Sequence, residues 1–260
     1  MVGVDKRRLS EFAEETNQFL PRAAGTRGID TPRFFAVVGP DWVSVSRVRL
    51  REDEIEDAVA EVRTLLPGAR SVEWTIGPSS TPAGLPERLR ALGFGDPDPP
   101  NKPTFAALAL DREPPGVDGI DVRRVETFRD FLAALEVVFE ANPFREEDEA
   151  RMRAEAREDY ERLRSRPGGA WLAYVDGRAA AAAVATACER GLYLAGGSTA
   201  PWARGRGCYR ALVRARWDDA VARGTPGLVV HAQHGTSRPI LERLGFELVC
   251  ELHELEDRGR

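Results

Sequence analysis

The sequence predicts an α/β protein built from two similar domains. One order of strands and helices occurs twice along the 260 residues, and a stretch rich in proline and glycine separates the two copies. Hydrophobic residues make up 42% of the chain and charged residues 30%, which is enough apolar side chain for two cores of ordinary size.

The first copy is visible in its hydrophobic spacing. Residues 43–50 alternate in polarity as a half-buried strand does, and residues 52–66 have the spacing of an amphipathic helix. A second strand is expected at 71–76 and a short helix at 85–92, which ends in Leu92-Gly93-Phe94. A glycine in this place commonly closes a helix in the left-handed conformation, and the aromatic residue after it enters the core.

Two segments interrupt the pattern by their composition. Residues 95–103 and 111–119 are rich in proline, glycine and charge, and a short strand is predicted between them at 104–110. The second segment is the better linker because a complete pattern of elements starts after it. We therefore place a boundary near residue 115, which gives domains 1–114 and 115–260.

The second copy repeats the order of the first. Charged helices with apolar stripes are expected at 128–141 and 146–164. A hairpin turn at Asp176-Gly177 makes the alanine run 179–183 a strand despite its helix propensity. The elements that repeat the first copy are a strand at 192–199, a helix at 207–223, a strand at 228–232 and a helix at 237–243 that ends in Leu244-Gly245-Phe246.

The informative segment joins the strand 192–199 to the helix 207–223. It contains a diglycine, Gly196-Gly197, and then the residues Arg204-Gly205-Arg206-Gly207. Glycines let a backbone approach a ligand closely, and the free N–H groups and dipole of a helix N-terminus favour a bound phosphate. The segment therefore predicts a diphosphate-binding loop.

Residues 199–212, TAPWARGRGCYRAL, resemble the acyl-CoA-binding motif of GNAT acetyltransferases, and residues 237–249, SRPILERLGFELV, resemble the motif that follows it in that family. The resemblance covers 170–255 well and 121–167 by pattern only. It implies a mixed α/β fold, α+β in the stricter sense, with two GNAT-like domains. Each would have a mixed, mostly antiparallel sheet flanked by helices, with splayed strands in the C-terminal copy.

The resemblance also implies acetyl-CoA as donor substrate and a set of binding residues. The main chain of Ser198, Thr199 and Ala200 would pair with the pantetheine arm, and a bulge at Gly196-Gly197 would open a slot for the acyl group. The residues expected around the diphosphate are Arg204, Gly205, Arg206, Gly207, Cys208 and Tyr209. Tyr209 departs from the family pattern, in which a small residue is usual.

The acid and base of the transfer are less constrained. In many GNAT enzymes a tyrosine just before the x-x-LGF segment acts as the general acid that protonates the departing thiolate. This chain has Leu241 at that position. Tyr209, or Tyr193, is the candidate that could replace it, and His231 is the candidate base, followed by His234. Each of these residues has an alternative reading as a packing or hydrogen-bonded structural residue.

Further roles are expected outside the loop. Phe144 and Tyr160 lie in the region that forms the acceptor side in the family, although a core position suits both equally well. Cys208 could be a thiolate nucleophile at a helix start, against the simpler reading of a small residue packed beneath the loop. In the first copy, residues 49–54 (RLREDE) place acids at a helix start, which repels phosphate, so that copy is expected to be degenerate and not to bind CoA.

Composition excludes several other classes. The net charge of -5 argues against a general nucleic-acid binder, and no run of 18 apolar residues would cross a membrane. Three unpaired cysteines and three histidines suggest neither disulfides nor a metal site. The charged start, residues 1–17, favours a cytoplasmic location. We expect a monomer or homodimer.

The sequence thus predicts an N-acetyltransferase that acts on a primary amine of a small molecule or peptide. The alternatives are a non-catalytic acyl-CoA-binding regulatory protein and a GNAT-like scaffold that does not bind CoA.

Overall fold

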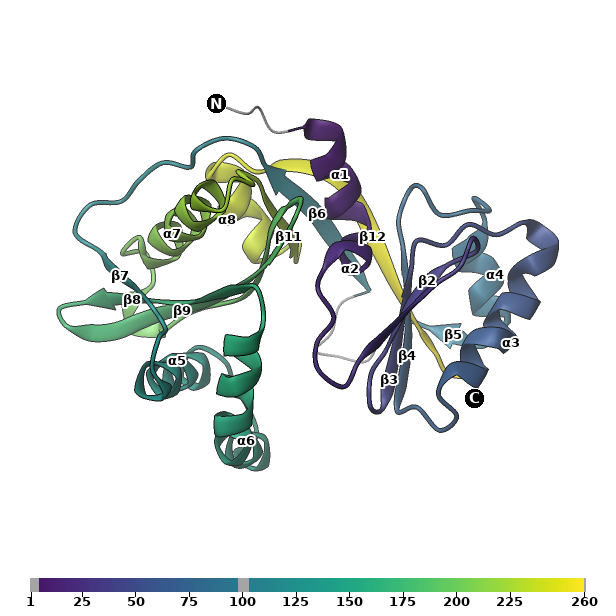
Figure 1. Ribbon diagram of the computed structural model, residues 1–260, viewed down its shortest axis with the longest axis horizontal. Helices are drawn as coiled ribbons and strands as arrows, with labels where there is room; N and C mark the ends of the chain where they lie inside the picture. Colours follow the sequence, from purple (N-terminus) through teal and green to yellow (C-terminus); the bar gives the residue numbers. More distant parts are fainter. Residues whose placement is uncertain (1–4, 98–102, 260) are drawn as a thin grey trace. The chain divides into compact units, whose positions relative to one another are not determined.

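The computed structural model describes residues 5–97 and 103–259, which fall into two compact units. We call them the glycine-loop unit, which consists of the chain up to Leu9, Ala109–Val230 and Arg243–Phe246, and the N-terminal unit, which consists of Ser10–Leu108, His231–Glu242 and Glu247–Arg260. Part of the predicted segment 95–103 lies outside the described residues. Figure 1 shows the elements of both units.

The glycine-loop unit has a five-stranded sheet in the order β11-β10-β9-β8-β7. The neighbouring strands are antiparallel except for β10 and β11, which are parallel. Helices α5 and α6 lie on one face of the sheet and α7 on the other (Figure 1). The bounds are β7 Asp121–Arg124, α5 Phe128–Ala141, α6 Glu146–Ser165, β8 Gly168–Val175, β9 Arg178–Cys188, β10 Gly191–Thr199, η2 Pro201–Ala203, α7 Cys208–Ala222 and β11 Leu228–Ala232.

The alanine run is a strand, as predicted. Asp176 has a φ of 52° and Gly177 a φ of 78°, the left-handed values that a tight hairpin turn requires, and β8 and β9 pair on either side of them. Ala180, Ala181, Ala182 and Ala183 are all buried. Their small side chains leave room for helices to pack closely on both faces of the sheet.

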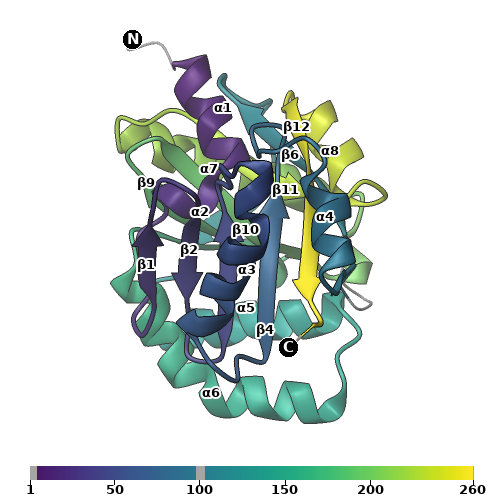
Figure 2. The same ribbon diagram turned by 90° about the vertical axis from the view of Figure 1, so that its right-hand side faces the viewer.

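The N-terminal unit has strands in the order β1-β2-β3-β4-β12-β6, with β5 beside β12. Figure 2 shows α3 and α4 in front of this sheet, and Trp74 of β4 lies fully buried in the core beneath them. The bounds are α1 Lys6–Glu14, α2 Thr16–Phe19, β1 Arg27–Asp30, β2 Phe35–Val38, β3 Trp42–Ser46, η1 Glu52–Glu54, α3 Ile55–Leu65, β4 Ser71–Ile76, α4 Leu85–Ala91, β5 Phe94–Gly95, β6 Thr104–Leu110, α8 Ser237–Arg243 and β12 Glu247–Asp257.

The two LGF segments have the same conformation. Gly93 and Gly245 have φ values of 95° and 97°, and each follows a short helix. Phe94 and Phe246 are buried, with 5% and 3% of their surface exposed. This confirms the predicted helix stop followed by a core aromatic residue in both copies.

The predicted strand 43–50 is shorter than expected. β3 ends at Ser46 because Arg47 adopts a left-handed φ of 50°, which breaks the extended chain. The predicted helix 52–66 begins as the 3-10 turn η1 and continues as α3.

The last strand, β12, belongs to the N-terminal unit, whereas the residues directly before it, Arg243–Phe246, belong to the glycine-loop unit. β12 pairs antiparallel with β4, with Leu255 opposite Trp74, and it also pairs with β5. The N-terminal unit therefore contains segments from both ends of the sequence. The division into domains 1–114 and 115–260 stays a prediction about the duplicated sequence.

Asp257 at the end of β12 forms a buried ion pair. Its carboxylate is 1% exposed and accepts hydrogen bonds from Arg63 Nε at 2.7 Å and Arg63 Nη2 at 2.8 Å. We expect Asp257→Ala to lower the free energy of unfolding by about 3 kcal/mol, because it leaves a partly buried guanidinium without its partner. Denaturant unfolding measures this. Asp96→Ala, which removes the exposed pair of Asp96 with Arg90, should change the same quantity by less than about 1 kcal/mol, and equal losses would contradict the assignment.

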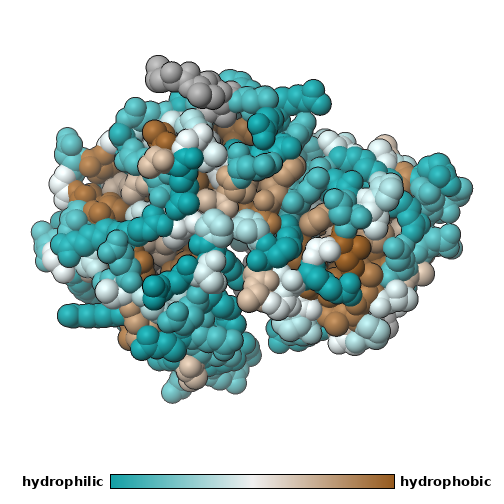
Figure 3. All heavy atoms as spheres, viewed as in Figure 1, coloured by the Kyte–Doolittle hydropathy of each residue, from teal (hydrophilic) through white to brown (hydrophobic). Residues whose placement is uncertain are grey.

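Much of the visible surface is hydrophilic, including most of the area over α6 (Figure 3). Among residues 5–97 and 103–259, no helix combines the length and the apolar character that crossing a bilayer requires.

Candidate functional site

The predicted strand, loop and helix are present in the glycine-loop unit. β10 leads through the short turn η2 to Arg204, and α7 begins at Cys208. α7 packs against β8, β9 and β10. The loop is therefore fixed at both ends by buried structure.

A bulge interrupts β10 at the predicted diglycine. The register between β10 and β9 shifts between Ala195 and Ser198, and Gly196 has a φ of 56°. The pairing of β10 with β11 runs from Leu192 opposite Leu228 to Leu194 opposite Val230. β10 continues to Thr199 along β9 alone, so the two parallel strands splay beyond the bulge, as the sequence predicted.

The main chain beyond the bulge is held from one side. Ser198 and Thr199 pair with Ala182 and Ala181 of β9, and the Ala200 N–H donates to the Ala180 carbonyl at 2.9 Å. An extended ligand can hydrogen-bond to the other edge of such a strand as an added strand does. Binding of a pantetheine arm by Ser198, Thr199 and Ala200 stays a prediction.

The helix start is suited to an anion. Gly207 is the N-cap of α7 with a left-handed φ of 89°, no side chain caps the helix, and its first turn has no acidic residue. The amides of Cys208, Tyr209 and Arg210 are the N-terminal ones that have no acceptor within the helix. Their N–H groups and the helix dipole favour a phosphate there.

The two loop arginines lie at the surface beside this helix start. Arg204 Nη2 donates to the Ala141 carbonyl at 3.4 Å, and Arg206 Nη2 pairs with Asp176 at 3.2 Å. Gly205, between them, has a φ of 79° and open space around it. Both cations can therefore turn toward an anion at the cost of one weak surface contact each.

Tyr209 and Cys208 occupy different surroundings. The Tyr209 ring lies against β10: a Cβ on Gly197 would be 2.8 Å from Tyr209 Cε2. Burial raises the pKa of Tyr209, and the nearby Arg216 guanidinium opposes that rise. Cys208 is 1% exposed, and burial also raises the pKa of its thiol, which supports the packing role and not the thiolate.

Solved structures of known proteins share this architecture. A GCN5-related N-acetyltransferase from Kribbella flavida is similar to this chain with a TM-score of 0.72 and 19% identity, over 100% of this chain and 98% of that one. A tandem GNAT protein from the clavulanic acid biosynthesis pathway is similar with a TM-score of 0.61 and 15% identity, over 97% and 95%. The chain has the tandem GNAT fold.

A third GNAT structure agrees. A GCN5-related N-acetyltransferase from Sphaerobacter thermophilus is similar with a TM-score of 0.57 and 18% identity, over 88% of this chain and 82% of that one. No protein-family model and no curated protein matches the sequence. At these identities the likeness is one of fold, and it confirms the predicted fold class and tandem arrangement.

Within the GNAT fold, the predicted acceptor side is formed by α5, α6 and their connection. Phe144 is 37% exposed and makes an edge contact with Phe139. Tyr160 is 4% exposed, packs against Phe128, and donates its hydroxyl hydrogen to the Glu126 carbonyl at 2.7 Å. These contacts give Tyr160 a packing role, and contact of either residue with a substrate stays a prediction.

A polar cluster beside the loop was not predicted from the sequence. Trp202 Nε1 donates to Glu140 at 3.0 Å, Arg178 pairs with the same carboxylate at 2.7 Å, and the Arg178 guanidinium lies 4.4 Å from the Trp202 ring centre. Asn142 donates to the Ser198 hydroxyl at 3.2 Å. Together these contacts tie the C-terminal end of α5 to η2 and β10. The one feature of the sequence that could have indicated this cluster is the position of Trp202, two residues before Arg204.

The usual acid position of GNAT enzymes is apolar here. Leu241 on α8 is fully buried, so it takes no part in proton transfer. His234 forms an ion pair with Glu251 at 3.1 Å when it is protonated. No group of three or more histidine, cysteine or acidic side chains in the described residues is placed to hold a metal ion.

His231 belongs to the N-terminal unit and is held there by residues of α1 and α2 in the same unit. Its Nε2 lies 2.8 Å from the Ala13 carbonyl and 3.2 Å from the Thr16 hydroxyl, so Nε2 carries the hydrogen and donates it. Burial lowers the pKa of His231 from 6.5. The imidazole is therefore neutral at pH 7, and its role as the catalytic base stays a prediction.

Replacement of His231 should show whether it serves folding or proton transfer. The folded state disfavours the proton, so wild-type stability rises with pH up to the unfolded pKa near 6.5 and falls as the pH drops below it. We expect His231→Ala to lose about 1–3 kcal/mol at pH 7 and to lose this pH dependence. Thermal unfolding from pH 5 to 8 measures it, and an unchanged pH profile of turnover in the folded variant would exclude His231 as the base.

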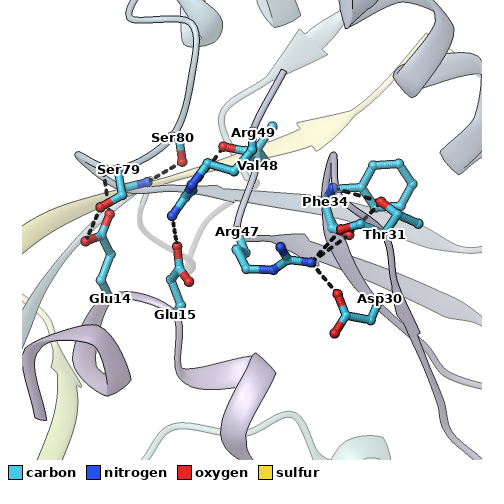
Figure 4. Close-up of polar contacts among 11 residues, drawn as sticks. Glu14, Glu15, Asp30, Thr31, Phe34, Arg47, Val48, Arg49, Ser79 and Ser80 are labelled. Carbon is cyan, nitrogen blue, oxygen red and sulfur yellow. Dashed lines mark hydrogen bonds and ion pairs between the residues drawn. The ribbon is translucent and has the colours of Figure 1, made fainter. Parts of the chain in front are cut away.

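The first GNAT copy lacks the opening between its parallel strands. After β3 and β4 part, the Thr81 N–H donates to the Val48 carbonyl at 3.1 Å and the Leu50 N–H donates to the Thr81 carbonyl at 3.2 Å. Arg49 pairs with Glu15, and Ser79 N donates to Glu14 at 2.6 Å (Figure 4). The main chain that would face a pantetheine arm is thus already hydrogen-bonded.

The helix start of the first copy is also filled. η1 consists of Glu52, Asp53 and Glu54, and the Glu54 carboxylate accepts from the Arg51 N–H at 2.8 Å. Three carboxylates at this helix start repel an anion, so the expectation that this copy does not bind CoA has a physical reason in the structure as well.

Proposed function

We propose that the glycine-loop unit is an acetyl-CoA-dependent N-acetyltransferase that acetylates a primary amine of a small molecule or peptide. The observation that carries this proposal is the splay of β10 from β11 directly before a helix start that has two left-handed glycines and no acid. This combination provides a strand edge for an extended arm and an anion site at its end.

In this proposal, different residues of the unit bind different parts of acetyl-CoA. The amides of Cys208, Tyr209 and Arg210 bind the diphosphate, with Arg204 and Arg206 beside them. Ser198, Thr199 and Ala200 offer main-chain groups to the pantetheine arm. Acetyl-CoA supplies the activated thioester. Orientation of the two reactants can lower such a barrier by about 7 kcal/mol or more, so the binding residues carry most of the expected rate enhancement.

Proton transfer completes the reaction. The amine nitrogen attacks the thioester carbon, the carbon–sulfur bond breaks, and a proton passes from the nitrogen to the base while the sulfur receives one from the acid. Tyr209, whose raised pKa keeps its phenol protonated at neutral pH, suits the acid. His231, neutral at pH 7, is the candidate base.

A non-catalytic acyl-CoA-binding protein is the second candidate, because Leu241 is buried and apolar at the usual acid position. The two functions differ in turnover. Purified protein with acetyl-CoA and a panel of primary amines should release free thiol in an amine-dependent manner. Binding of acetyl-CoA without thiol release favours the regulatory protein, and the absence of binding favours the scaffold.

A further inference from the structure

Arg216 is a buried cation whose described hydrogen bonds go to the main chain and not to a carboxylate. It lies on α7 with 1% of its surface exposed. Nε donates to the Leu212 carbonyl at 3.0 Å and Nη1 to the Val184 carbonyl at 3.3 Å. Nη2 is buried without a hydrogen-bond partner among the described residues. Burial lowers the pKa of Arg216 to about 10, against the attraction of Tyr209.

Such a residue is unfavourable for stability. A buried charge without an opposite charge carries a large desolvation penalty, and apolar residues of similar volume often replace buried ions without loss of stability. The position of Arg216 therefore calls for a reason other than folding.

The contacts of Arg216 point to the β10 bulge. Val184, whose carbonyl accepts from Nη1, is the last β9 residue in register with β10 before the shift, opposite Ala195. A bulge leaves ladder groups unpaired at this point. The guanidinium thus takes up a main-chain carbonyl at the edge of the bulge.

Tyr209 supports the other half of the same bulge. It lies two helical turns before Arg216, so both side chains leave α7 on the same face. Its ring fills the space beside Gly197, where a Cβ would come within 2.8 Å of Cε2, and the nearby phenol raises the pKa of Arg216 against the effect of burial. The two side chains form one support beneath Gly196-Gly197.

We propose that Arg216 is a positioning residue, which with Tyr209 fixes the bulge and so sets the main chain of Ser198 and Thr199 for the pantetheine arm. This inference rests on the proposed function. It predicts that Arg216 affects one part of the donor only, because the diphosphate amides belong to the helix start and not to the bulge.

The test compares two ligands on the intact protein. Arg216→Met should bind acetyl-CoA about tenfold more weakly, because a displaced main chain at Ser198 and Thr199 loses roughly one hydrogen bond to the pantetheine arm. It should bind 3′-phospho-ADP, which lacks the pantetheine arm, as tightly as the wild type does. Its melting temperature should not fall. Arg216→Lys, which keeps the charge, should recover part of the acetyl-CoA affinity.

Arg214→Met is the matched control. Arg214 lies on the same helix and makes two surface ion pairs, with Glu113 at 2.6 Å and Asp218 at 2.9 Å, and this variant should bind both ligands as the wild type does. Gly197→Ala displaces the bulge from the opposite side and should reproduce the selective loss, even if Arg216→Met were to fold poorly.

Equal losses for both ligands, or no loss for acetyl-CoA in folded Arg216→Met or Gly197→Ala, would overturn this inference and leave the transferase proposal intact. A wild-type protein that binds neither ligand would overturn both.

Discussion

Gly207→Val is expected to weaken acetyl-CoA binding by at least about 100-fold, which corresponds to about 3 kcal/mol. A β-branched residue strongly disfavours the φ of 89° at this position. Its Cβ would also come within 2.9 Å of Val117 Cγ1. The first turn of α7 must therefore shift, and the amides that would bind the diphosphate shift with it. Isothermal titration calorimetry measures the loss.

The control for this prediction lies at the other end of the same helix. Gly224 follows α7 with a φ of 76° and open space around it. Gly224→Val introduces the same kind of strain, about 1–2 kcal/mol of stability, away from the loop. It should retain full acetyl-CoA affinity. If the two variants bound the donor equally well, the assignment of the loop would be wrong.

Expression of residues 115–260 alone is expected to give an aggregated or unfolded product. β12 has its pairing partners β4, β5 and β6 in the first 114 residues. Its side chains Leu252 and Leu255 are each 1% exposed in the intact chain. Removal of the partners leaves β12 with unpaired main-chain groups at its edge and exposes the apolar face that carries these leucines, which favours aggregation. Size-exclusion chromatography and far-ultraviolet circular dichroism measure the outcome.

Co-expression of residues 1–114 should restore a soluble complex, because it returns the partner strands to β12. The matching control is residues 115–246, which lack β12 and should aggregate less. A monomeric 115–260 fragment that unfolds cooperatively would contradict this account and would support the domain boundary drawn from the sequence.

Local patterns in the sequence were sufficient to predict most of the helices and strands. The helix predicted at 128–141 and the strands at 71–76 and 228–232 have the predicted bounds in the structure. These segments are long or strongly patterned, so their hydrophobic spacing decides them. The bulge was also predictable, since paired glycines inside a strand have few other uses.

Long-range partners were not predictable in the same way. Nothing in the composition of 247–257 shows that this strand pairs with β4, since any exposed strand edge offers the same hydrogen bonds. The shortening of β3 depends on the left-handed Arg47, a conformation that side chains rarely adopt.

The candidate site likewise contains residues that the sequence indicates and residues that only the structure reveals. The loop residues could be named as candidates because glycines and arginines at a helix start have a specific chemical use. Arg216 was missed because an arginine on an amphipathic helix normally lies at the surface, and only packing shows that it is buried. For Tyr160 the sequence left substrate contact and a core position open, and only the packing shows that its hydroxyl donates to the Glu126 carbonyl, 34 positions away.

Calorimetric titration of acetyl-CoA into the intact, folded chain shows whether the glycine-loop unit binds this donor. We expect saturable heat with one site per chain, competed by 3′-phospho-ADP, because only one of the two GNAT copies has an open helix start. The absence of heat at millimolar acetyl-CoA, or two equivalent sites per chain, would contradict this expectation.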